Sequence, residues 1–140
     1  MSALAVTANN VAPSGSFGKV NCELGATVTA GQVIYQKSSD SKWYLAQCDG
    51  TAEESGYGVQ MAIALANGVA NQWIVGLTSG TYTSGATHTK GYEVLVHTTA
   101  GSFTETIGDV AVSTQYRTRI GYSTSTTQVA VDFLATGLVY

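Results

Sequence analysis

Apolar and polar residues follow one another in short runs along most of this chain, and glycine, serine, threonine and asparagine separate the runs. The run from Lys19 to Leu24 alternates with a period of two, which is typical of a half-buried β-strand. Similar runs of strand-forming residues occur at 32–36, 42–48, 59–66, 73–77, 92–97, 102–105, 109–112, 117–123 and 128–133. About ten short strands with turn residues between them predict an all-β barrel or sandwich.

Helix signals are confined to two places. Thr51-Ala52-Glu53-Glu54 has the spacing of a helix capping box, but Ser55-Gly56 follows at once, so we expect at most one short helix there. The run at 59–66 mixes the two tendencies, because alanine and methionine favour a helix whereas its short length and flanking glycines favour a buried strand. We predict a strand.

The first 18 residues differ from the rest of the chain, since they contain its only proline, followed by Ser14-Gly15-Ser16. They also contain apolar residues, which a purely flexible tail rarely carries. Two interpretations are open: a first strand with a loose loop after it, or an arm that becomes ordered against a partner. We describe the chain as an arm at 1–18 and one β-domain at 19–140. The partner-contacting residues of such an arm would be Leu4, Val6, Val11, Pro13 and Phe17.

An internal repeat divides the β-domain. Gly25–Gly31 aligns with Gly85–Gly91 at an offset of 60 residues, with five of seven positions identical. The alignment continues without a gap to place Trp43 on Phe103, and then at offsets of 57 and 56 to cover about 25–77 and 85–133. We therefore expect two similar halves that bury their apolar faces against each other. Trp43 and Phe103 are the strongest core candidates.

Charge and cysteine content exclude several classes of protein. Only 11% of residues are charged, the net charge is −3, and the six basic residues are scattered, so we expect no nucleic-acid partner. No run reaches the length of a membrane span. The N-terminus lacks the features of a signal peptide, so we expect folding in the cytoplasm. Cys22 and Cys48 are expected to be two buried thiols, although a disulfide between them is geometrically open.

The titratable residues of the sequence do not form a recognisable catalytic or metal-binding group. His88 and His97 lie nine residues apart, and no carboxylate pair is near both in sequence. Because His88 takes the place of Val28 in the repeat, we expect an exposed or rim histidine. Glu53 and Glu54 are expected to be solvated charges rather than an acid–base pair. We predict no enzyme activity, cofactor, metal or small-molecule substrate.

Three stretches carry a resemblance to a known family: Thr29–Tyr35 leading to Lys42–Ala46, Ile63–Leu65 followed by Asn67–Gln72, and Leu77–Thr81. In order and spacing they resemble the head decoration, or cement, proteins of tailed bacteriophages, over roughly 20–135. The chain departs from that family at Ala62, where glycine is frequent.

The resemblance implies a β-barrel or β-tulip domain with an N-terminal arm. It also implies a homotrimer, made in the bacterial cytoplasm, that binds the major capsid protein on the outer surface of the virion and stabilises contacts between capsid subunits without catalysis. The alternative is a glycan- or receptor-binding module of a phage fibre or adhesin. In that case aromatic side chains, which otherwise belong to the core or to interfaces, would form a sugar platform. The candidates are Tyr35, Trp43, Tyr44, Tyr57, Trp73, Tyr82, Tyr92 and Tyr116.

Overall fold

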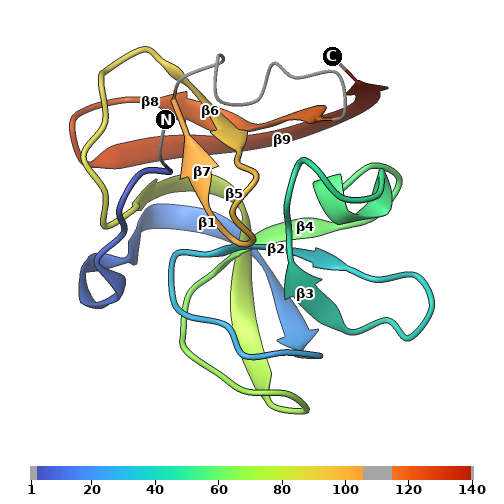
Figure 1. Cartoon of the computed structure of the whole chain (residues 1–140). Helices are drawn as coiled ribbons and strands as arrows, with labels where there is room; N and C mark the ends of the chain where they lie inside the picture. Colours follow the sequence, from blue (N-terminus) through green and yellow to red (C-terminus); the bar gives the residue numbers. More distant parts are fainter. Residues whose placement is uncertain (1–2, 106–114, 140) are drawn as a thin grey trace.

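The structure is a computed structural model that describes residues 3–105 and 115–139. Within them, an antiparallel sheet curls into a half-barrel (Figure 1) with the strand order β3-β2-β4-β5-β9-β8-β6-β7, and β1 pairs with β5 beside this path. The strands are β1 (Ala12–Glu23), β2 (Val33–Gln36), β3 (Trp43–Leu45), β4 (Met61–Ala64), β5 (Trp73–Thr83), β6 (Glu93–Val96), β7 (Phe103–Thr104), β8 (Tyr116–Ser123) and β9 (Gln128–Val139). The all-β prediction is confirmed. The strand predicted at 109–112 lies outside the described residues.

Helical structure in the described residues is limited to two short 3-10 turns, η1 (Ala8–Asn10) and η2 (Glu53–Ser55). The Thr51 hydroxyl accepts the N–H of Glu54 at 3.2 Å, which is one half of the predicted capping box. Gly56 ends η2 with a φ of +98°, a conformation that favours glycine. Within residues 3–105 and 115–139, no helix is both long and apolar enough to span a bilayer.

The two predicted halves have the same connectivity. β2 pairs with β3 and β4, and β4 pairs with β5, while β6 pairs with β7 and β8, and β8 pairs with β9. Tyr35 lies opposite Tyr44 in one half, and Leu95 lies opposite Thr104 in the other. These two pairs are 60 residues apart, so the first hairpins of the two halves pair in the same register. The expectation of two similar halves is confirmed.

The sequence alignment of the repeat is wrong in one detail. It places Ala64 on Gly121, whereas the hydrogen bonds from Gly31 to the Ala64 carbonyl and from Gly91 to the Ser123 carbonyl make Ala64 equivalent to Ser123. The cause is the irregular pairing of β8 on both of its sides near Arg119 and Gly121. A bulge inserts a residue into one strand, so a single offset of 57 cannot hold on both sides of the irregularity in β8.

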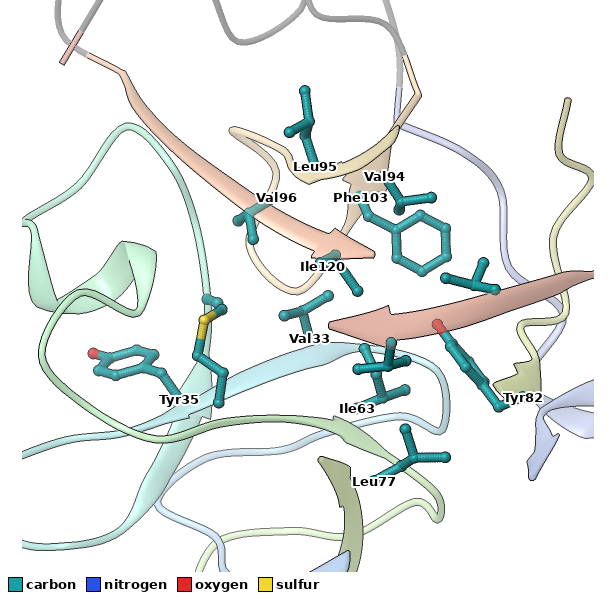
Figure 2. Packing of buried hydrophobic residues seen from close by; sticks show 14 of the residues in the cluster. Val33, Tyr35, Ile63, Leu77, Tyr82, Val94, Leu95, Val96, Phe103 and Ile120 are labelled. Atoms are coloured by element: carbon teal, nitrogen blue, oxygen red, sulfur yellow. The ribbon is translucent and has the colours of Figure 1, made fainter. Parts of the chain in front are cut away.

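The larger hydrophobic cluster lies where the halves face each other. Figure 2 shows the side chains of Val33, Ile63 and Leu77 converging with those of the second half, labelled Val94, Val96, Phe103 and Ile120. A second cluster, which includes Trp43 and Leu24, covers the other face of the first half. Trp43 and Phe103 are fully buried, as predicted, although they belong to different clusters.

The N-terminal residues lie along the protein's own β-domain. β1 runs from Ala12 to Glu23, so the later part of the predicted arm belongs to a strand, but that strand continues past residue 18 where the first interpretation placed a loose loop. Residues 3–11, which we name the N-terminal strap, donate main-chain hydrogen bonds from Leu4 to the Phe103 carbonyl and from Thr7 to the Gly85 carbonyl, both at 2.9 Å.

Four of the five residues expected to contact a partner pack against the larger cluster, namely Leu4, Val6, Val11 and Phe17. Pro13 is exposed. A role for these five residues in partner binding stays a prediction, and it would require them to make contacts beyond those that they make within their own chain.

Both cysteines are buried and free. Cys22 lies in the smaller cluster and Cys48 in the larger one. Burial raises the pKa of Cys22 to about 12 and that of Cys48 to about 11. They are therefore buried neutral thiols, as predicted.

Candidate functional site

One turn motif occurs three times, and its third copy differs in chemistry. In the first two copies a glutamine caps the turn: the N–H of Thr29 donates to Gln32 Oε1 at 2.8 Å, and the N–H of Val69 donates to Gln72 Oε1 at 3.0 Å. In the third copy, the N–H of Thr89 donates instead to the carboxylate of Glu105, at 3.0 and 3.2 Å. Glu105 directly follows β7, so a distant residue replaces the local cap.

The same carboxylate binds His88, which in turn binds Ser84. His88 Nδ1 lies 3.1 Å from Glu105 Oε2, and His88 Nε2 lies 2.5 Å from Ser84 Oγ. Ser84 directly follows β5, and His88 lies in the loop that leads to β6. The loop, β5 and the end of β7 thus position a continuous Ser84–His88–Glu105 chain of hydrogen bonds.

The neighbouring donors fit one placement of the protons in this chain. Glu105 Oε2 also accepts the hydroxyl of Ser123, and an ionised carboxylate can only accept. With Glu105 ionised and the imidazole in its neutral form, His88 Nδ1 donates to Glu105 and Nε2 accepts the hydroxyl of Ser84. Ser84 Oγ itself accepts the N–H of Ala86 at 3.2 Å. Every polar atom of the chain thereby has a partner, as a buried network requires.

Burial overturns the expectation for His88. Its side chain is fully buried, that of Glu105 is 9% exposed, and the ring of Phe103 stacks on the imidazole at 5.9 Å. The repeat supplies the reason. Leu24 and Val28, both buried in the first half, correspond to Ser84 and His88 in the second, so an apolar pair is replaced by a hydrogen-bonded one.

The other titratable candidates do not join this site. His97 is buried separately, and its Nδ1 accepts the N–H of Thr99 at 3.1 Å. Glu53 binds the hydroxyl and the amide of Ser38, which hold its pKa below the usual value. Glu54 accepts a hydrogen bond from Gln47 at 2.9 Å. Among the described residues, no group of three or more His, Cys, Asp or Glu side chains gathers as metal ligands do.

A cleft of about 490 Å³ lies beside the loop that carries Ser84 and His88, although none of the three residues of the hydrogen-bonded chain lines it. It is lined by Thr7 and Asn10 of the strap and by Thr83, Gly85, Ala86, Thr87 and Thr127. Ser84 itself has no exposed surface. The arrangement has the order of nucleophile, base and orienting acid that acyl-transfer sites use, but in this conformation the nucleophile is covered.

A separate surface carries exposed apolar side chains. Along β5, Trp73 and Val75 are exposed at 66% and 37%, whereas Ile74 and Gly76 between and beside them are buried. Because alternate residues of a strand share a face, Trp73 and Val75 project together. Tyr57 and Tyr92 are also exposed, whereas Tyr35 and Tyr82 are core residues.

Comparison of the chain with protein-family models and with curated proteins finds no match.

Proposed function

We propose that the protein is a decoration protein with a non-enzymatic role on the capsid: it binds the assembled head of a tailed bacteriophage as a homotrimer and strengthens contacts between major capsid protein subunits. The proposal rests on the resemblance carried by Thr29–Tyr35 leading to Lys42–Ala46, by Ile63–Leu65 with Asn67–Gln72, and by Leu77–Thr81. In the fold these stretches lie in β2, β3, β4, β5 and the turns between them, which are the parts that define the first half.

The observation that carries the proposal furthest is the apolar pair on β5. An exposed tryptophan on a rigid strand is typical of an interaction surface, because tryptophan dominates the binding energy of many interfaces. β5 is held by hydrogen-bonded neighbours along its length, namely β1, β4 and β9. Trp73 and Val75 can therefore be buried against a capsid subunit with little loss of conformational freedom.

A bridging role fits the composition of the surface. With 11% charged residues, contacts would depend mainly on shape, apolar area and hydrogen bonds, and salt would screen them little. A trimer that touches several subunits gains affinity through effective concentration even when each contact is weak. Because it binds only the assembled shell, it stabilises that shell by mass action.

The test is co-sedimentation of the purified protein with expanded, undecorated heads. We expect saturable binding that Trp73→Ala weakens at least about tenfold, since a tryptophan at the centre of an interface contributes about 2 kcal/mol or more. Tyr92→Ala, a change at another exposed aromatic residue, is the matched control and should bind like the wild type. Absence of the protein from the head fraction at saturating concentration would refute the proposal.

The exposed ring of Trp73 also gives the glycan-binding alternative a candidate contact residue that can be tested. If Trp73 stacked on a sugar, added oligosaccharide would quench or shift its fluorescence, while Trp43, which is buried, would not respond. A sugar-dependent change in the wild type that Trp73→Ala removes, together with no binding to heads, would favour the alternative.

A further inference from the structure

We propose that Ser84 is a nucleophile, activated by His88 and oriented through Glu105, that the N-terminal strap covers, and that it reacts with acyl or phosphonyl electrophiles when the strap opens. This activity would be additional to the decoration role and does not depend on it. Three observations carry the inference: the hydrogen-bonded chain, the cleft beside its loop, and the contacts of the strap with the main chain at Ser84 and Gly85.

The chain has the polarity that nucleophilic catalysis needs. Ser84 Oγ lies 2.5 Å from His88 Nε2, and His88 Nδ1 lies 3.1 Å from Glu105 Oε2; with a neutral imidazole and an ionised Glu105, the hydroxyl donates to Nε2 and Nδ1 donates to the carboxylate. Two further groups, the amide of Thr89 and the hydroxyl of Ser123, hold the carboxylate in place. Glu105 is therefore a positioning residue that fixes the tautomer of His88, as the acid of a Ser–His–acid triad does.

The strap packs against the main chain at Ser84 and Gly85. Its Thr7 lies directly on Gly85: the N–H of Thr7 donates to the Gly85 carbonyl at 2.9 Å, and a Cβ at Gly85 would lie 2.5 Å from the Thr7 carbonyl oxygen. Val6 and Val11 reach the same place, since a Cβ at Gly31 would lie 2.7 Å from Val6, 2.9 Å from Val11 and 3.6 Å from the Ser84 carbonyl oxygen.

The strap is only partly buried along its length. Leu4, Val6 and Val11 pack on the larger cluster without being fully buried, and the main-chain donors of the strap to the β-domain are the amides of Leu4 and Thr7. Partly exposed segments with few hydrogen bonds open locally without global unfolding. Opening at Thr7 would extend the cleft of about 490 Å³ toward Ser84.

The reaction would proceed by general-base catalysis. Ser84 Oγ forms a bond to the electrophilic carbon or phosphorus, and its proton passes to His88 Nε2. The bond to the leaving group then breaks, and the leaving group takes that proton from His88, which returns to its neutral form. With an ester, water would release the acyl group by the same steps in reverse. With a fluorophosphonate, fluoride leaves and the phosphonyl group stays on Ser84.

The experiment is labelling of the full chain with an alkyl fluorophosphonate, followed by intact mass and peptide mapping. We expect one adduct, on Ser84, and none in Ser84→Ala. Glu105→Gln should slow labelling about tenfold or more, because the imidazole loses its orienting charge. Thr7→Pro, which removes the donor to Gly85, should accelerate labelling about fivefold, the effect of one lost hydrogen bond on local opening. Lys19→Ala, a change at an exposed residue of β1 outside the strap and the cleft, should match the wild type.

A serine hydrolase labelled in the same tube shows that the probe is active, and circular dichroism shows that each variant is folded. Absence of an adduct from both the wild type and Thr7→Pro would overturn the inference. So would an adduct on Ser84 whose rate is the same in folded Glu105→Gln as in the wild type, because that result would leave Ser84 without activation. Neither outcome depends on whether the protein binds heads.

Discussion

Val28 and Gly68 exchange two main-chain hydrogen bonds, of 2.8 and 2.9 Å, and thereby join two copies of one turn back to back. Each copy has a residue in the left-handed region, Gly31 with a φ of 92° and Asn71 with a φ of 72°. Each copy also has a glutamine whose side chain caps the turn. The first half therefore contains a local two-fold relationship within the larger two-half repeat.

This relationship predicts equal effects of two distant substitutions. Gln32→Ala and Gln72→Ala each remove a side-chain acceptor from a turn amide, so each should lower the free energy of unfolding by about 1 kcal/mol. Urea denaturation measures both. A loss confined to one of the two variants would contradict the equivalence of the turns.

The buried network predicts a larger effect at His88. His88→Val restores the residue of the first half but removes one partner from Glu105, which keeps the Thr89 amide and the Ser123 hydroxyl, and removes the imidazole partner of Ser84. Because two buried polar groups each lose a hydrogen bond, the variant should lose about 2 kcal/mol of stability. Thr87→Val, next in the chain and exposed, is the control and should change little. If His88→Val were as stable as the wild type, the network would not stabilise the fold.

The two tryptophans should respond oppositely to truncation. Trp43→Ala removes a side chain that is 1% exposed and should cost about 3–5 kcal/mol through lost transfer energy and a cavity. Trp73→Ala, at 66% exposure, should change stability by less than about 0.5 kcal/mol. Chemical denaturation distinguishes the two. A comparable loss in Trp73→Ala would mean that Trp73 supports the fold and is not available as a docking residue.

Asp40 should contribute stability that acid removes. The Tyr44 hydroxyl donates to it at 2.6 Å and the Lys42 amide at 3.0 Å, and these bonds hold the pKa of Asp40 below its usual 3.8. A lowered folded-state pKa means that the contribution is complete above the unfolded value and is lost as the pH falls through the folded one. The difference in Tm between the wild type and Asp40→Asn should therefore shrink below about pH 4. A difference that stays constant down to pH 2 would contradict this assignment.

The strands and the two halves could be predicted because they depend on local alternation and on a repeated turn. The run from Lys19 to Leu24 and the match of Gly25–Gly31 with Gly85–Gly91 were sufficient for them. The start of β1 was not predictable, because residues 13–18 have the composition of a turn. They belong to a strand only because they pair with β5. The pairing is irregular there, with register shifts between Ser14 and Gly18 and between Gly18 and Lys19, and these irregularities accommodate the turn-forming residues.

The Ser84–His88–Glu105 chain was missed for a related reason. Glu105 is 17 residues from His88, and only the register of β6 with β7 and the path of the loop bring them together. One signal was present in the sequence: Leu24 and Val28 change together to Ser84 and His88, four residues apart in both copies. A coupled change from an apolar pair to a polar pair indicates a hydrogen bond in the interior.

The most direct test of the decoration role is calorimetry of expanded, undecorated heads with and without the protein. The account predicts that saturating protein raises the temperature at which the heads disrupt, that Trp73→Ala gives a smaller rise at the same concentration, and that Tyr92→Ala gives the full rise. Heads that disrupt at the same temperature with and without the wild-type protein would contradict it.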